Sequence, residues 1–186
     1  MNARLGTIKE AGDKHELRYE RRFDHSVERV WAAITEPDEL RGWLAAAEEL
    51  DLREGGAIQL RWLNVPDDTE EWQDKGIEIP DDHDMSAPVR GTITQLDPPN
   101  LIEYETDEMG LMRWELRGEG SGCALTFTNT IELPGGHLPE QTLAGWHIHL
   151  DHLDVVLAGG EIDWSNWTDK YMDQWEGIRS QYVAAL

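Results

Sequence analysis

The hydrophobic positions alternate with polar ones through much of the chain, which is typical of half-buried strands. In residues 57–62, Ile58, Leu60 and Trp62 alternate with Gln59 and Arg61. The remaining strands that we predict span 16–24, 47–53, 89–96, 101–106, 111–117 and 123–132. Turn sequences rich in Gly, Pro and Asn lie between several of them, so we expect a run of hairpins.

A helical spacing of three and four residues replaces this alternation after Pro134. It predicts a long helix over roughly 139–158, which Gly159-Gly160 ends. Its narrow apolar stripe consists of Leu143, Trp146, Leu150, Leu153 and Leu157. Two shorter helices are predicted after the first strand, one capped by Ser26 and one opened by Pro37.

The last segment of the chain is rich in tryptophan and also has near-helical spacing. Its aromatic and apolar positions are Trp164, Trp167, Tyr171, Trp175, Ile178 and Tyr182. Such a stripe fits a surface that docks a partner. It fits better a segment that packs back over the sheet or over the mouth of a pocket.

Length and composition fit one domain. The 186 residues, 39% of them hydrophobic, supply one sizeable core. We expect a flexible N-terminus at 1–15 and a single domain at 16–186, with an acidic loop insertion at 64–86. No apolar run reaches about 18 residues and no signal-peptide core is present, so we expect a cytoplasmic protein. Cys123 is the only cysteine, which excludes an internal disulfide.

Charge limits the partners. There are 38 acidic against 16 basic residues, a net charge of −22. We therefore expect no nucleic acid and no membrane partner. Such acidity with only four lysines fits a salt-adapted host and also fits a GC-rich genome. Asp81-Asp82-His83-Asp84 lacks the spacing of an EF-hand loop, so a solvated acidic loop is favoured there over a cation site.

The order of elements and four motifs resemble a known family, the heat-shock-protein-ATPase-activator homologue (AHSA-type) family. It belongs to the START-like, SRPBCC superfamily. The motifs cover most of residues 16–158. They are Arg22-Phe23-Asp24-His25-Ser26 with Val30-Trp31-Ala32-Ala33-Ile34-Thr35-Glu36-Pro37 and Leu40-x-x-Trp43, then Gly55-Gly56, then Gly91-Thr92-Ile93 through Leu96-Asp97-Pro98-Pro99-x-Leu101, and finally Ala144-Gly145-Trp146 through Leu150-x-x-Leu153.

The resemblance implies an α+β fold of the helix-grip type. In it a curved antiparallel sheet wraps around a long C-terminal helix and leaves an apolar pocket between them. The chain departs from the family in its acidic loop at 64–86, in Leu44 where a second aromatic often follows Trp43, and in the tryptophan-rich segment after Gly160. These departures concern the mouth of the pocket.

The candidate ligand-binding residues are those that we expect to face this pocket. They are Leu60, Trp62, Trp114, Phe127, Asn129, Trp146, His147, Leu150 and Leu153. Large aromatic side chains also fill ordinary cores, so packing is the alternative reading. Asn129 shares the apolar face of its strand and needs hydrogen-bond partners, from neighbours or from a ligand.

The long helix contains three histidines that are candidate chemical groups, His147, His149 and His152. His147 follows Trp146 and is the weak candidate for a catalytic base at the border of the pocket, while a solvated or half-buried polar face is the alternative for all three. No zinc signature, GxSxG motif or phosphate-binding glycine loop is present, so we expect no metal and no cofactor.

Three functions remain open from the sequence. The first is binding of a hydrophobic small molecule between sheet and helix. The second is an enzyme of polyketide cyclase, dehydratase or hydrolase type that uses the same pocket. The third is a chaperone-associated interaction protein. A titratable pair facing the pocket would favour the enzyme, and exposed tryptophans after Gly160 would favour the interaction protein. Monomer and homodimer are both open.

Substitution of Trp146 tests the predicted helix register. If Trp146 lies on the buried stripe, Trp146→Ala lowers the free energy of unfolding by roughly 3–5 kcal/mol, as expected for a truncated core tryptophan. Urea denaturation followed by circular dichroism measures the change. A variant as stable as the wild type would mean that Trp146 faces solvent.

Overall fold

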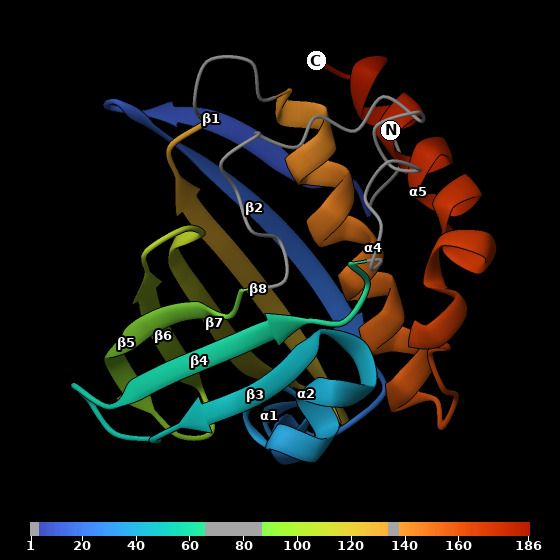
Figure 1. Ribbon diagram of the computed structural model, residues 1–186. Helices are drawn as coiled ribbons and strands as arrows, with labels where there is room; N and C mark the ends of the chain where they lie inside the picture. Colours follow the sequence, from blue (N-terminus) through green and yellow to red (C-terminus); the bar gives the residue numbers. More distant parts are fainter. Residues whose placement is uncertain (1–3, 66–86, 134–137) are drawn as a thin grey trace.

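In the computed structural model, the described residues 4–65, 87–133 and 138–186 form one antiparallel sheet and its covering helices (Figure 1). The sheet has eight strands in the order β1-β2-β8-β7-β6-β5-β4-β3. The strands are β1 Thr7–Ala11, β2 Lys14–Phe23, β3 Ala45–Leu50, β4 Ala57–Trp62, β5 Val89–Asp97, β6 Leu101–Thr106, β7 Gly110–Glu119 and β8 Gly122–Ile131. All of the predicted strands are confirmed, with boundaries shifted by a few residues.

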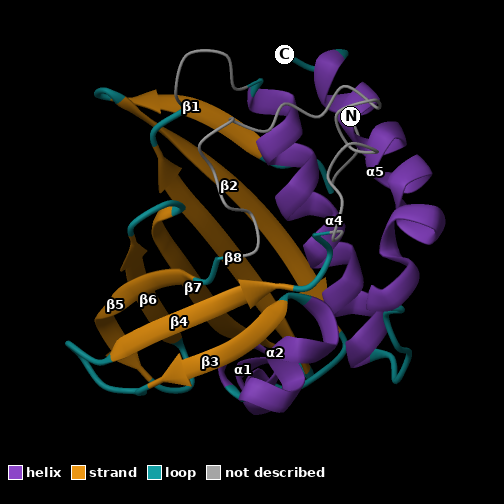
Figure 2. Cartoon of the chain, in the orientation of Figure 1, coloured by secondary structure: helices purple, strands orange, loops and turns teal. Residues whose placement is uncertain are grey.

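The helices form two further layers. They are α1 Val27–Thr35, α2 Pro37–Trp43, α4 Pro139–Leu157, the 3-10 turn η1 Trp164–Asn166 and α5 Trp167–Val183. The sheet curves around α4, and α5 packs on the other side of α4 (Figure 2). This is the predicted helix-grip fold, with the long helix at its predicted place. We call the space between the inner face of the sheet and α4 the grip interior.

Alternation along the strands decides which side chains enter the grip interior. In β8, Cys123, Leu125, Phe127, Asn129 and Ile131 are buried, while the residues between them are partly exposed. A side-chain period of two places every second residue on the inner face. The helices α1 and α2 pack beside β3, β7 and α4, where the indole Nε1 of Trp43 donates a hydrogen bond to the carbonyl of Ala33 at 2.8 Å.

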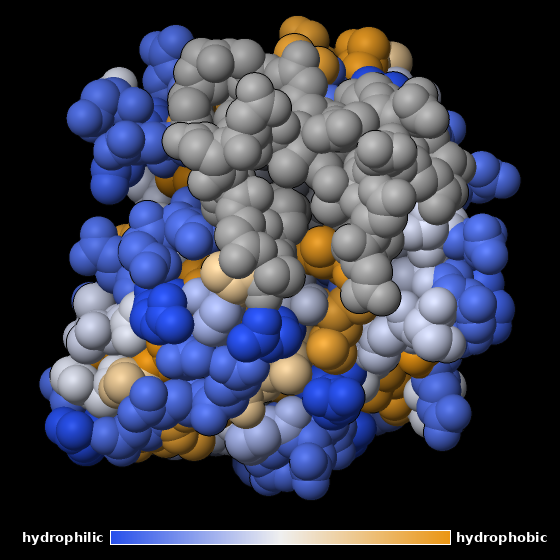
Figure 3. Space-filling model, viewed as in Figure 1, coloured by the Kyte–Doolittle hydropathy of each residue, from blue (hydrophilic) through white to orange (hydrophobic). Residues whose placement is uncertain are grey.

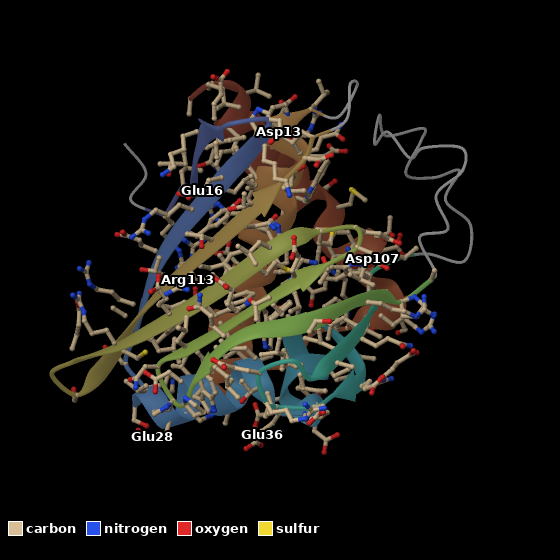
Figure 4. All side chains as sticks on the ribbon, turned by 90° about the vertical axis from the view of Figure 1, so that its left-hand side faces the viewer. Asp13, Glu16, Glu28, Glu36, Asp107 and Arg113 are labelled. Atoms are coloured by element: carbon tan, nitrogen blue, oxygen red, sulfur yellow. The ribbon has the colours of Figure 1, made fainter. Side chains whose placement is uncertain are left out.

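The outer face of the sheet is a lattice of charged side chains (Figure 4). Arg113 pairs with Glu103 at 2.9 Å. A shallow hollow of about 940 Å³ on this face is lined partly by arginines. These arginines include Arg22 and Arg117, which both pair with Glu119, at 2.9 and 2.6 Å. Exposed pairs of this kind contribute little to stability, but they balance charge locally.

Part of the segment 1–15, which we expect from the sequence to be flexible, is a strand. Thr7–Ala11 form β1, which pairs with β2 in antiparallel register from Thr7 with Arg18 to Ala11 with Lys14. The backbone N–H of Gly6 donates to the Tyr182 hydroxyl at 2.7 Å. An edge strand is held mainly by backbone hydrogen bonds on one side, so its sequence need not alternate clearly.

The acidic loop expected at 64–86 lies almost wholly outside the described residues, and Asp81-Asp82-His83-Asp84 lies there too. Among the helices that the structure describes, none is long and apolar enough to span a membrane.

The helix α4 is buried on nearly all sides, which corrects the expected solvated or half-buried histidine face. His147, His149 and His152 are only 4%, 6% and 2% exposed. The helix α5 covers the side of α4 that points away from the sheet and buries His147 and His152 (Figure 2). His149 is buried against Trp62 of β4 and Trp164 of η1. Neither ring nitrogen of His152 has a hydrogen-bond partner in the described part of the chain. Burial lowers the pKa of His147 and of His149 to about 4 and that of His152 to about 3.

Stability is therefore expected to fall steeply between pH 7 and pH 5. Unfolded histidine has a pKa of about 6.5, so the unfolded chain binds protons at these three positions where the folded chain does not. Each such proton lowers the free energy of unfolding by about 1.4 kcal/mol per pH unit below about pH 6.5, until the folded pKa is reached. Asp151, whose pKa is raised by burial, acts in the opposite direction. Urea denaturation at pH 7, 6 and 5 measures the slope.

The variant that tests this is His152→Gln. Because the folded chain does not bind a proton at His152 and the unfolded chain does, removing His152 should lower the slope by about one proton. Equal slopes in the wild type and His152→Gln would contradict the assignment.

Candidate ligand-binding site

Four aromatic side chains from four elements of the fold meet in the grip interior. They are Trp62 of β4, Trp114 of β7, Phe127 of β8 and Trp146 of α4, and we call them the aromatic cluster. The ring centroids of Trp114 and Phe127 are 3.9 Å apart, and those of Phe127 and Trp146 are 4.6 Å apart. Trp62 meets Trp146 edge to face at 5.9 Å. All four were predicted from the sequence to face the pocket.

The cluster runs from the core to the surface. Trp114, Phe127 and Trp146 are at most 3% exposed, whereas Trp62, the last residue of β4, is half-buried. Figure 3 shows hydrophobic atoms reaching the surface between β4 and α4, beside the grey region. Trp62 is therefore the outermost member of the cluster.

Asn129 fixes the position of Trp146. Its Oδ1 accepts a hydrogen bond from the indole Nε1 of Trp146 at 3.0 Å. Its Nδ2 donates to the carbonyls of Met109 and Leu111 at 2.6 and 3.3 Å. Both functional atoms of the amide are thus used by neighbours, which is the first of the two alternatives left open by the sequence. Asn129 therefore holds the indole of Trp146 in place by a hydrogen bond and has no free group for a ligand.

The predicted leucines lie in the same core as the cluster. Leu60 is 2% exposed, and Leu150 and Leu153 are fully buried. They supply apolar surface and no hydrogen-bonding group. Together with the cluster they give the grip interior an apolar lining.

His147 lies elsewhere than expected. We expected it to border the pocket, but its Nδ1 lies 2.9 Å from the Tyr182 hydroxyl on α5 and its Nε2 lies 3.7 Å from Asp151 Oδ1. One residue of an α-helix turns the side chain by about 100°, so the neighbour of Trp146 points to a different layer. The nearby guanidinium groups of Arg21 and Arg4 and the burial of the ring all lower the pKa of His147, so it is neutral at pH 7.

His149 is a site residue that sequence reasoning missed. Its ring lies between those of Trp62 and Trp164, with centroid distances of 5.6 and 6.3 Å. Its Nδ1 lies 3.3 Å from the carbonyl oxygen of Trp43 and donates to it, which leaves the lone pair on Nε2. Because burial lowers the pKa of His149 to about 4, the ring is neutral at pH 7. Its spacing of three residues from Trp146 was the available signal.

Tyr104 of β6 was also missed. It is 4% exposed, and its hydroxyl oxygen accepts a hydrogen bond from the indole Nε1 of Trp114 at 3.1 Å. The hydroxyl is thus attached to the edge of the aromatic cluster. The sequence predicts the strand over 101–106, but it gives no sign that an indole on the next strand would bind the oxygen of Tyr104.

Other reactive groups are scarce in the part of the chain that the structure describes. No group of three or more His, Cys, Asp or Glu side chains in these residues is arranged to hold a metal ion. Cys123 is buried opposite Phe23, and burial raises the pKa of its thiol. A protonated, buried thiol is a poor nucleophile.

Comparison with known proteins identifies the family. The family model described as Activator of Hsp90 ATPase homolog 1-like protein matches residues 24–158, which is more than half of the chain. None of the curated proteins with which the sequence was compared matches it significantly.

Solved structures from several bacteria share the fold. CalU16 from Micromonospora echinospora is 20% identical, with a TM-score of 0.62 over 98% of this chain and 96% of that one. The protein encoded by gene BPP1335 from Bordetella parapertussis is 21% identical, with a TM-score of 0.65 over 98% and 93%. A conserved protein of unknown function from Enterococcus faecalis is 18% identical, with a TM-score of 0.59 over 93% and 91%.

The strands β1 and β2, the turn η1 and the helix α5 lie outside the family match, and the CalU16 structure covers 98% of this chain. Identities near 20% carry the fold and no more. On the family match and the helix-grip architecture together, the chain belongs to the Activator of Hsp90 ATPase homolog 1-like family of the SRPBCC superfamily.

Proposed function

We propose that the protein binds a flat, apolar small molecule in the grip interior. The observation that carries the proposal is the aromatic cluster, which β4, β7, β8 and α4 bring together between sheet and helix. Binding sites for small molecules are mostly apolar and aromatic, with a few polar groups at fixed points. Trp62, half-buried at the end of β4, is the member that a molecule entering from the surface would meet first.

The energetics favour a flat ligand. Aromatic pairs in stacked or edge-to-face contact contribute roughly 0.5–1.5 kcal/mol beyond the burial of area. The cluster offers both geometries, because Trp114 and Phe127 are inclined by 21° and Trp62 and Trp146 by 73°. A flat ring inserted beside Trp62 would find one face to stack on and one edge to meet.

The alternative of an enzyme in the same pocket has less support. The titratable pair that the sequence suggested, His147 with an acid, does exist as His147 and Asp151, but it lies against α5. His149 is the titratable side chain that contacts Trp62. A neutral histidine alone, without an acid near it among the described residues, favours binding over acid–base catalysis.

The alternative of a chaperone-associated interaction protein loses the surface on which it relied. Trp167 and Trp175 are 4% and 7% exposed because they pack against α4 rather than facing solvent. The apolar residues after Gly160 therefore support a structural role for α5. A small-molecule site remains the better proposal.

The test is binding of fluorene, a flat hydrocarbon, to the purified protein by equilibrium dialysis. Wild type should bind it saturably, with one site per chain. Trp62→Ala should raise the Kd about three- to tenfold, as expected for the loss of one aromatic contact. Trp175→Phe is the control, because Trp175 is buried on α5, outside the aromatic cluster.

Two results would contradict the proposal. One is the absence of saturable binding by the folded wild type. The other is an equal rise in Kd for Trp62→Ala and Trp175→Phe, which would place the fluorene elsewhere. Native mass spectrometry of protein purified from its own host then asks which molecule occupies the site naturally.

A further inference from the structure

The hydroxyl group of Tyr104, only 4% exposed, is a buried donor at the edge of the aromatic cluster whose proton is unassigned within the described residues. Its oxygen accepts from Trp114 Nε1 at 3.1 Å. A phenol has one O–H to donate, and none of the described residues accepts it. The hydroxyl already has one partner, as buried hydroxyl groups normally do, and its O–H is left to donate.

Neighbouring polar side chains do not share this property. The amide of Asn129 donates to two carbonyls and accepts from Trp146. The hydroxyl of Tyr19 donates to the carbonyl of Leu143 at 2.9 Å, and that of Thr106 donates to the carbonyl of Gly110 at 3.2 Å. These three neighbouring side chains thus use their donors within the fold, whereas the O–H of Tyr104 is left over.

The position of Tyr104 suits contact with a molecule in the grip interior. It lies opposite Met112 of β7, which in turn lies opposite Asn129 of β8. Its oxygen is bonded to the edge of the same indole whose face stacks on Phe127 at 3.9 Å. A ring placed against the aromatic cluster thus has this hydroxyl at its margin.

We propose that Tyr104 donates its hydrogen bond to the ligand, and that the natural ligand is a flat aromatic molecule bearing an acceptor oxygen such as a ketone or quinone carbonyl. This inference rests on the proposed function of the grip interior and narrows its ligand class. A plain hydrocarbon would leave the donor unused, and a ligand offering only N–H groups would meet a second donor. Burial raises the pKa of Tyr104 well above its ordinary value, so the group remains a donor throughout the neutral range.

The experiment compares two probes of nearly equal shape, fluorene and 9-fluorenone, which differ by a CH2 group against a carbonyl. Wild type should bind 9-fluorenone about three- to tenfold more tightly, the gain of one neutral hydrogen bond. In Tyr104→Phe this preference should vanish while the Kd for fluorene stays within about twofold. Tyr182→Phe, which removes a hydroxyl bonded to Gly6 and His147, is the matched control and should keep the preference.

Infrared spectroscopy adds a readout that does not depend on affinity. The carbonyl stretch of bound 9-fluorenone should lie at lower wavenumber in wild type and in Tyr182→Phe than in Tyr104→Phe. Circular dichroism confirms that each variant is folded before it is titrated.

The outcomes separate the two proposals. Equal binding of both probes by wild type, or a preference that survives in Tyr104→Phe, overturns the role of Tyr104 and leaves the grip interior as a binding site. Failure of wild type to bind either probe overturns the binding site itself, and the role of Tyr104 with it.

Discussion

The hydrogen bond from Trp146 to Asn129 sets the arrangement on which the other layers depend. It joins α4 to β8 at 3.0 Å inside the core, where a lost partner would leave two buried polar groups unpaired. The rotation of α4 about its axis is thereby fixed. With Trp146 directed at the sheet, Leu150 and Leu153 are buried in the same core, while His147 and His152 meet α5.

The second layer on α4 explains the unusual polarity of this helix. A helix between a sheet and solvent has one apolar stripe, but α4 lies between the sheet and α5. Its outward positions carry histidines that α5 surrounds with Trp167, Tyr171 and Tyr182. The neutral form of these imidazoles is favoured here, because removal from water raises the free energy of the protonated form. The burial that holds the layers together therefore also makes them sensitive to acid.

Charge and aromatic surface are separated cleanly in this molecule. On the outer face of the sheet, arginines pair with glutamates. The grip interior holds apolar and aromatic side chains and a short inventory of polar atoms, nearly all of which are used by neighbours. An unused donor stands out against that background, and it is the ground for assigning a polar contact to the ligand.

The sequence by itself determined the strands, the long helix and the members of the aromatic cluster, because periods of two and of three to four residues report which face of an element is buried. Its motifs also indicated the family that the comparisons confirm. Only the tertiary structure decided what each face is buried against. The hydrogen bond between Trp114 and Tyr104 joins residues 10 positions apart, and the contact of His147 with Tyr182 joins residues 35 positions apart. The strand β1 is held to β2 by its backbone at the edge of the sheet. Local periodicity carries no information about such partners, since they are brought together only when the sheet closes around α4.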